Sequence, residues 1–327
     1  MALSFSTRGV AVRQSFAKGP VQVLTVLGVF VVGMLVVPGF ADPSSVRAML
    51  VIASFLGIAA VGQTFVILIG GIDLSLPALL GAGNVIAARL AGDGVPSPLV
   101  IAVVLCLGAA VGVANGLVTA LWKLPSLVVT LATGSLAGGA VLLWTNATLT
   151  GSAPAWLTSF TSAVSGVGPI PLAPVVVAWV VLTVAAQVFL LRSRPGRQIQ
   201  MLGANREAAR LMLVGESRIT ALCFGISGAL AALSGLLLTG FTGAGLFTVG
   251  DPYLFESIAA VVIGGTTLVG GRGGAGRSLL GSLTLTTLTT LLIGLSLTTP
   301  AQQAVLGAVI VAVTALYGRD RAVGDRI

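Results

Sequence analysis

The amino-acid sequence predicts an all-α polytopic membrane protein with about ten transmembrane helices and both termini in the cytoplasm. Of the 327 residues, 56% are hydrophobic and only 8% are charged, whereas roughly 25% of the residues of an ordinary soluble domain are charged. The charges lie between uncharged apolar runs that are long enough to cross a bilayer. Because so few charges could not cover the surface of a water-soluble fold, we expect the lipid bilayer to surround most of the chain.

The composition also excludes several classes of function. Histidine is absent, and the two cysteines, Cys106 and Cys223, stand alone within apolar runs. The chain therefore offers no histidine-based catalysis, no common zinc site and no disulfide framework, and we expect neither catalytic nor metal-binding residues. The net charge of +8 does not indicate nucleic-acid binding, because the basic residues are distributed between apolar runs.

The first predicted span follows a basic N-terminal segment. Arg8, Arg13 and Lys18 precede an uncharged apolar run at 19–41, an order that resembles a secretory signal peptide. The run is long enough to cross a bilayer, however, and many further spans follow it. We therefore expect an uncleaved first helix behind a cytoplasmic tail at 1–19.

The spacing of the charges sets the other predicted spans. A helix needs about 20 apolar residues to cross roughly 30 Å of hydrocarbon. Two uncharged runs are long enough for two helices each, and breaks near Pro169 and Pro300 divide them. A single transmembrane domain at 20–317 then precedes a cytoplasmic tail at 318–327. The predicted spans are 20–41, 48–70, 74–91, 98–122, 126–147, 172–191, 219–241, 253–270, 278–297 and 302–317.

The distribution of the basic residues tests this topology. With ten spans and a cytoplasmic N-terminus, all of the 17 basic residues except Arg47 and Arg89 fall in cytoplasmic segments. Cytoplasmic loops are enriched in lysine and arginine, so the skew supports both the count and the orientation. The spans at 74–91 and 253–270 are the weakest, and without them the count would be eight.

These two weak spans adjoin similar segments. Residues 66–75, VILIGGIDLS, align with residues 260–269, AVVIGGTTLV, and both contain Ile-Gly-Gly, then a polar residue and leucine. Paired short, glycine-interrupted segments in the two halves of a transporter point to a translocation path. The alignment predicts an internal repeat, although glycine pairs also arise by chance in a chain with 44 glycines.

The acid of the first segment has two interpretations. Ser75 and Pro77 are typical of a helix start, where a side-chain oxygen caps the free amides and proline needs no donor. Asp73 is therefore expected to act as a cap at the inner membrane face. The alternative is a contact with the transported solute. Glu256 lies near the outer edge of its span, where water can hydrate an acid.

Polar side chains within the spans need hydrogen-bond partners, so they face other helices or a wet cavity. Gln63, Asn84, Asn115 and Thr130 are in this position. Hydrogen bonding between helices is the simpler explanation for each one, and lining of a path is the alternative. The candidates for the translocation path are Gln63, Gly70, Gly71, Asp73, Asn115, Thr130, Gly264 and Gly265.

A row of glycines predicts where one pair of helices packs. Gly108, Gly112 and Gly116 recur every four residues, so they lie on one face of a helix. Small residues at this spacing let membrane helices approach closely, and we expect the row to be a packing face.

The largest predicted cytoplasmic loop, 192–218, is rich in arginine. Residues 205–212 have a helical pattern that places Leu211 and Met212 on an apolar face, and Gly215 is expected to end this helix. A short helix of this kind at the cytoplasmic surface rests against lipid headgroups or a partner protein. Alternatively, the loop is only a positively charged topological anchor.

Residues 271–278, GRGGAGRS, have the spacing of a phosphate-binding loop with Arg277 in the place of lysine. Such a loop needs a preceding buried strand and a nucleotide-binding fold, whereas this segment connects two predicted spans. We expect no cofactor in this chain, and if ATP drives the protein, another chain binds the ATP and its magnesium.

Several motifs together resemble one family. The chain is similar, from about residue 48 to 317, to the permease subunits of ribose/xylose-type monosaccharide ABC importers, a bacterial binding-protein-dependent transport family. Each motif is short, but they follow the family's order and the joint match is specific. The motifs are GQT at 62–64, IGGIDLS at 69–75, ANG at 114–116, LP at 124–125, VTLAT at 129–133, GANREAARL at 203–211, ISGALAALSG at 226–235, IAAVVIGGT at 258–266 and GGRG at 270–273.

The resemblance implies a multi-subunit importer in the bacterial inner membrane. Two permeases, as a homodimer or a heterodimer, would sit on a pair of ATPase subunits, and a periplasmic sugar-binding protein would dock outside. The segment around 205–215 would be the helix that couples the permease to the ATPase. The spacing from Ala209 to Gly215 is longer than in importers in general, and no Ile-x-Leu-Pro follows, which leaves the register of the contact open. The coupling residues would be Asn205, Arg206, Glu207, Ala208, Ala209, Arg210 and Gly215.

The implied function is translocation of a ribose-like monosaccharide by alternating access, powered by the separate ATPase. The scarcity of charge within the spans suits a neutral solute. A permease for branched-chain amino acids or nucleosides keeps this architecture and is one alternative. A stand-alone secondary transporter is another, but it would place ionisable residues at mid-membrane, and only Asp73 and Glu256 come near. A membrane-embedded enzyme is the least favoured class, because no catalytic group stands out.

Overall fold

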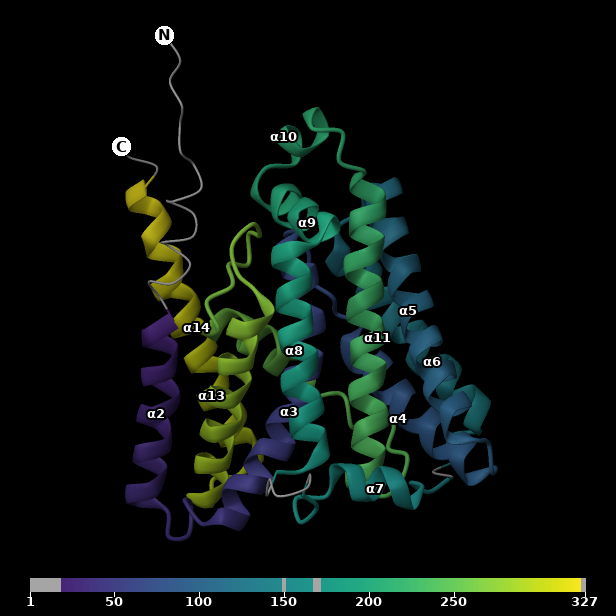
Figure 1. Ribbon diagram of the computed structural model, residues 1–327, viewed down its shortest axis with the longest axis vertical. Coiled ribbons are helices and arrows are strands. Elements are labelled where there is room, and N and C mark those ends of the chain that lie inside the picture. The colour runs from purple at the N-terminus through teal and green to yellow at the C-terminus, as the bar shows by residue number, and fades with distance from the viewer. Residues whose placement is uncertain (1–18, 149–150, 167–171, 325–327) are drawn as a thin grey trace.

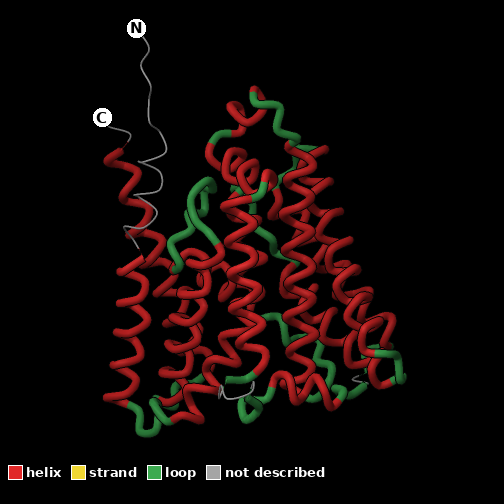
Figure 2. The backbone as a smooth tube through the Cα atoms, viewed as in Figure 1, coloured by secondary structure: helices red, strands yellow, loops and turns green. Residues whose placement is uncertain are grey.

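The computed structural model describes residues 19–148, 151–166 and 172–324, and helices dominate these ranges (Figure 1). The described residues contain no strand (Figure 2). The predicted tail at 1–19, apart from its last residue, lies outside the described residues, and so does the end of the tail at 318–327. The all-α prediction is therefore confirmed for the described chain.

A helix lies at each of the ten predicted spans, because uncharged apolar runs form helices and the polar breaks end them. Six of these helices, α2, α3, α4, α5, α8 and α14, carry proline in the first turn, where its missing amide leaves no hydrogen bond unmade. The ten helices are α2 (Gly19–Val36), α3 (Pro43–Leu68), α4 (Leu76–Gly92), α5 (Ser97–Leu121), α6 (Ser126–Thr145), α8 (Pro174–Arg192), α11 (Glu216–Thr242), α12 (Tyr253–Ile263), α13 (Ala275–Gly294) and α14 (Thr299–Gly324).

Three shorter helices lie at the two ends of the bundle. The helix α7 (Ala155–Thr161) crosses one end, at the bottom of Figure 1. The helices α9 (Arg194–Ala204) and α10 (Arg206–Leu211) lie at the opposite end, where the last turns of α14 also lie. The helix predicted within the arginine-rich loop is thus present, as α10, and it projects from the body of the molecule.

Five helices of the described chain are long and apolar enough to cross a membrane, namely α3, α5, α6, α8 and α11. The helices α2, α4 and α12 are apolar but shorter. The prediction of one continuous span over 253–270 is wrong, because α12 ends at Ile263 after 11 residues, a length of about 16 Å. The helix α14 continues to Gly324, past the predicted start of the tail at 318. The total of ten spans and the cytoplasmic position of both termini stay predictions.

The core is formed by α3 and α11, most of whose residues are buried among other helices. The helix α11 packs against α3, α4 and α5. Large apolar side chains are instead exposed along α2, α5, α6 and α8, for example Leu24, Leu117 and Leu131. We assign these faces to contact with lipid, where an apolar surface carries no cost.

The glycine row on α5 is a packing face, as predicted, and its partner is α11. A Cβ atom at Gly108 or Gly228 would overlap the main chain of the other glycine, so the two backbones touch directly. A Cβ at Gly112 would overlap the Phe224 carbonyl, and one at Gly116 would lie 2.6 Å from the Cα of Ala221. Only small residues allow this approach of two membrane helices.

Candidate functional site: interrupted helices and a cytoplasmic helix

The helix α3 ends in a backbone motif built on its glycine pair. The Gly70 amide donates to the Ile67 carbonyl at 2.9 Å, and the Gly71 amide donates to the Val66 carbonyl at 3.0 Å. Gly70 has a φ of 75°, in the left-handed region that glycine adopts without strain. This arrangement is a Schellman motif, which ends a helix and satisfies two of its free carbonyls.

The helix α12 ends in the same motif, displaced by one residue in the alignment. The Gly265 amide donates to the Val262 carbonyl at 2.8 Å, and the Thr266 amide donates to the Val261 carbonyl at 3.1 Å. Gly265 has a φ of 87°. The left-handed residue is therefore the first glycine of the pair in α3 and the second in α12. The two segments share local geometry, which supports the repeat at these positions, while a repeat of the whole halves stays a prediction.

Asp73 lies in the segment between α3 and α4 and is only 1% exposed. Its carboxylate accepts the Ser75 amide at 3.0 Å, the Ser75 hydroxyl at 2.5 Å and the Ser227 hydroxyl of α11 at 2.8 Å. A buried carboxylate is stable only when donors of this kind surround it. The contacts hold Ser75, the residue before α4, and attach it to α11, but no side-chain cap bond to the first turn of α4 is present in the described chain, so a capping role for Asp73 stays a prediction.

The predicted path residues Asn115 and Thr130 lie against the same segment. The Asn115 amide of α5 donates to the Ser75 hydroxyl at 3.0 Å, and the Thr130 hydroxyl of α6 accepts the Leu74 amide at 2.9 Å. Three helices, α5, α6 and α11, thus converge on the chain between α3 and α4. Sequence reasoning assigned no role to Ser227, although it lies within the ISGALAALSG motif that carried part of the resemblance.

Gln63 is buried on α3, and neither its side-chain nitrogen nor its side-chain oxygen has a hydrogen-bond partner among the described residues. An unsatisfied buried polar group costs about 1–3 kcal/mol, so Gln63 is retained as a candidate for the path. Asn84 behaves as the helix-contact interpretation predicts. Its amide nitrogen donates to the Gly235 carbonyl at 3.2 Å and to the Thr239 hydroxyl at 3.0 Å, both on α11.

The glycine pair after α12 is held by other partners than Asp73 and its neighbours. The Gln22 side chain of α2 donates to the Gly264 carbonyl, and the Arg277 guanidinium donates to the Gly265 carbonyl at 3.3 Å. Arg277 is the residue that took the lysine position of the phosphate-loop spacing. In the fold it contacts the main chain at the end of α12, where a cation complements the partial negative charge of a helix C-terminus.

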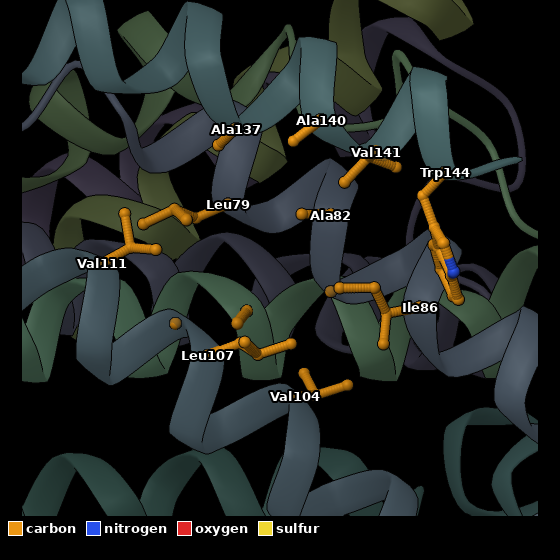
Figure 3. Close-up of a pocket in the computed structure, with 13 residues that line it drawn as sticks. Leu79, Ala82, Ile86, Val104, Leu107, Val111, Ala137, Ala140, Val141 and Trp144 are labelled. Atoms are coloured by element: carbon orange, nitrogen blue, oxygen red, sulfur yellow. The ribbon is translucent and has the colours of Figure 1, made fainter. Parts of the chain in front are cut away.

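An apolar cavity of about 260 Å³ lies between α4, α5 and α6 (Figure 3). Its labelled side chains are aliphatic except for Trp144 of α6. The cavity contains none of the residues predicted for the translocation path. A hydroxylated solute needs hydrogen-bond partners in place of water, so this apolar lining suits a hydrocarbon chain better than a sugar.

The projecting helix α10 is fixed at its start by a side-chain cap. The side-chain oxygen of Asn205 accepts hydrogen bonds from the main-chain amides of Glu207 at 2.9 Å and Ala208 at 3.0 Å. These bonds satisfy two free donors of the first turn. Arg206 and Arg210 form ion pairs with Glu216 at 2.9 and 3.1 Å. These pairs attach α10 to the first residue of α11, the helix at the centre of the core.

The apolar face of α10 points away from the molecule. Ala208 is exposed while Ala209 is 1% exposed, and Leu211, Met212 and Leu213 are 82%, 68% and 91% exposed. We call these three consecutive residues, 211–213, the apolar tip. An exposed apolar group at the end of a projecting helix is typical of an interaction surface.

The predicted end of this helix at Gly215 is wrong. The helix α10 ends at Leu211, and the left-handed residue is Leu213, with a φ of 55°. The Leu213 amide donates to the main-chain carbonyl of Arg210 at 2.9 Å, in the same type of motif that ends α3. Gly215 is instead the residue that precedes α11. A non-glycine residue in this conformation is strained, and here the strain presents the apolar tip.

Comparisons with known proteins agree with this arrangement. Residues 45–314 match the model of a family described as branched-chain amino acid transport system / permease component. The chain is 35% identical to the ribose import permease protein RbsC of Haemophilus influenzae, over 75% of this chain and 76% of that protein. No solved structure matches.

Two further relatives cover similar or larger shares of the chain. The inner membrane ABC transporter permease protein YjfF of Escherichia coli is 35% identical, over 78% of this chain and 79% of its own length. The autoinducer 2 import system permease protein LsrC of Shigella flexneri is 31% identical, over 90% of this chain and 87% of its own length. The region matched by the family model includes the ends of both interrupted helices and the projecting helix α10.

Proposed function

Because this chain belongs to the family of branched-chain amino acid transport system permease components, we propose that it is the membrane subunit of an ATP-driven importer in the bacterial inner membrane. A permease is a component of a transporter and not an enzyme. The solute would cross by alternating access, in which the helices rearrange around a central path. ATP and magnesium would bind to a separate ATPase subunit.

The apolar tip on α10 is the observation that carries this proposal. Its side chains are exposed at the end of the molecule that carries the arginine-rich segment, which the positive-inside rule places in the cytoplasm. Ion pairs hold the helix against α11, so a force on the tip would reach the core. An ATPase groove that accepts the tip would couple ATP binding to the movement of the helices. The contact residues would be Glu207, Ala208 and the apolar tip, whereas Asn205, Arg206, Ala209 and Arg210 would hold the helix in place from within the chain.

We propose a ribose-like monosaccharide as the cargo. One relative is a ribose import permease and another is an autoinducer 2 import permease, which favours a small hydroxylated solute. Charged side chains are scarce within the helices, and this suits a neutral cargo. A branched-chain amino acid, as in the family description, is the second candidate, and a nucleoside is the third.

We further propose that two permeases, as a homodimer or a heterodimer, form the path between them, and that a periplasmic sugar-binding protein delivers the cargo. The path would be lined by Gln63, by the segments that follow α3 and α12, and by the side chains of α5 and α6 beside them. The candidates besides Gln63 are Gly70, Gly71, Asp73, Asn115, Thr130, Gly264 and Gly265. Gln63 supports this most directly, since its buried side chain lacks a partner within the described chain.

Uptake by reconstituted protein tests the proposal. Proteoliposomes that contain the permease, its ATPase and the binding protein should accumulate labelled ribose or a related sugar only when ATP is present on the ATPase side. Accumulation of the solute by the permease alone under an ion gradient would contradict the proposal and would identify a secondary transporter. Preference for leucine or a nucleoside over sugars would reassign the cargo only.

Charged substitutions in the apolar tip test the proposed contact with the ATPase. The Leu211→Glu and Leu213→Glu variants should fold normally, because both side chains are exposed and surface changes alter stability little. Co-purification of the ATPase should fall about tenfold or more, as when a central apolar contact of an interface is lost. Val164→Glu is a matched control, since Val164 is 88% exposed at the α7 end of the molecule. Equal ATPase recovery from all three variants would contradict the contact.

A further inference from the structure

Three segments that are distant in the sequence meet directly beneath α10. They are the end of α3, the loop that follows α12, and the end of α9. The Gly271 amide of the loop donates to the Leu68 carbonyl of α3 at 2.9 Å. The Arg206 guanidinium, at the start of α10, donates to the next carbonyl, that of Ile69, at 3.4 Å. The end of α3 is therefore in contact with the loop after α12, with α9 and with Arg206 of α10 at one place, which we call the glycine junction.

Glycines make this approach of three backbones possible. A Cβ atom on Gly203 of α9 would overlap the Leu68 carbonyl oxygen and lie 2.6 Å from the Gly271 nitrogen. A Cβ on Gly270 would lie 2.9 Å from both the Gly70 nitrogen and the Leu68 oxygen. Main-chain atoms touch without side chains between them, so the contact has little freedom to absorb a displacement.

Arg206 connects the glycine junction to the rest of the cytoplasmic face. The last carbonyls of a helix have no partner within the helix and carry partial negative charge, and Arg206 supplies a cationic donor to one of them at the end of α3. One nitrogen of the same guanidinium pairs with Glu216 of α11 at 2.9 Å. A single side chain of α10 thus contacts the ends of both core helices.

We propose that Gly203 and Arg206 are positioning residues that transmit the movement of α10 to the end of α3 and to the loop that follows α12. The proposal rests on the proposed function, because it assumes that a partner moves α10. A displacement of α10 would move Ile69 through Arg206 and Leu68 through Gly203. Asp73 follows four residues after Ile69 and is hydrogen-bonded to Ser75, the residue before α4, so the start of α4 would move with it. Rigid contacts of this kind pass a shift at one site to another.

Two substitutions test the transmission in the assembled transporter. The Gly203→Ala variant forces the three backbones apart, and the Arg206→Gln variant removes the cation from the Ile69 carbonyl. In proteoliposomes with the ATPase and the binding protein, solute uptake should fall about tenfold, while ATP hydrolysis and ATPase co-purification stay near those of the unmodified complex. The measured quantity is the number of ATP molecules hydrolysed per solute transported, which should rise.

Two comparisons distinguish the transmission from other effects. Gly138→Ala is the control for the added methyl group, since a Cβ at Gly138 meets nothing within 4 Å, and it should leave the ratio unchanged. Arg210→Gln removes an ion pair with Glu216 but no contact with α3, so it should raise the ratio less than Arg206→Gln does. Equal ratios for these two arginine variants would overturn the role of Arg206.

The remaining outcomes separate this inference from the proposed function. If Gly203→Ala and Arg206→Gln lose uptake and hydrolysis in parallel, the glycine junction serves assembly or folding and the inference is overturned. If both variants match the Gly138→Ala control, it is also overturned, although the importer stands. Failure of the unmodified complex to couple ATP hydrolysis to uptake would instead reject the proposed function itself.

Discussion

At the scale of single residues, the chain between α3 and α4 shows how a buried acid is made stable in a membrane protein. The Asp73 carboxylate accepts three hydrogen bonds, two from Ser75 and one from Ser227. Each hydrogen bond to a charged group contributes about 1.5–3 kcal/mol. The acid therefore joins the residue before α4 to α11, while the cap that the sequence predicted from Ser75 and Pro77 stays a prediction. The part played by Ser227 could not be predicted, because 154 residues separate it from Asp73.

The capping and path interpretations of Asp73 predict different effects of substitutions at this position. Asn keeps an oxygen for Ser75 and the Ser227 hydroxyl can turn to accept, so Asp73→Asn should lower the unfolding temperature in detergent only slightly. Asp73→Ala leaves three donors unpaired, at about 1–3 kcal/mol each, and should lower it by many degrees. A variant Asp73→Asn that is as stable as the parent but fails to transport would contradict the capping role and favour a contact with the solute.

At the scale of the helices, small residues decide how closely the elements pack. Gly112 of α5 and Gly225 of α11 allow main chain to touch main chain, where no hydrophobic force draws helices together in lipid. The four-residue spacing predicted this face from the sequence, since every residue that forms it lies on one helix. The partner helix could not be predicted, because any apolar helix offers a compatible surface.

The packing face predicts a difference between two Gly→Ala changes. Gly112→Ala places a methyl group against the Phe224 carbonyl and should cost about 1–3 kcal/mol, the usual range for overpacking. Gly138→Ala on α6 meets nothing within 4 Å and should be neutral or stabilising, because alanine favours a helix over glycine. Thermal unfolding followed by tryptophan fluorescence compares the two variants, and equal midpoints would contradict the close packing of α5 on α11.

At the scale of the whole molecule, the fold separates two ends with different roles. One end carries α9, α10 and the glycine junction, and the other carries α7. The basic residues of the arginine-rich segment lie at the first end, which the positive-inside rule assigns to the cytoplasm. The apolar faces of α2, α5, α6 and α8 lie between the two ends and suit the bilayer.

Labelling of single cysteines tests this orientation. In a background with Cys106→Ser and Cys223→Ala, a membrane-impermeant maleimide should label Val164→Cys in right-side-out vesicles. It should label Leu213→Cys only in inverted vesicles. Both positions are highly exposed, at 88% and 91%, so access to them is not limited by burial. Labelling of Leu213→Cys from the outside would invert the topology and remove the basis for an ATPase contact.

The sequence by itself determined the properties that depend on local composition. Uncharged apolar runs determined where helices form, glycine spacing determined one packing face, and the pattern at 205–212 determined a short helix within the arginine-rich loop. It did not determine where α12 and α10 end, because the left-handed residues, Gly265 and Leu213, depend on the contacts of the surrounding chain. Only the tertiary structure brings Leu68, Gly203 and Gly271 together. Contacts between distant segments depend on how the helices pack, and a pattern within one segment carries no information about that packing.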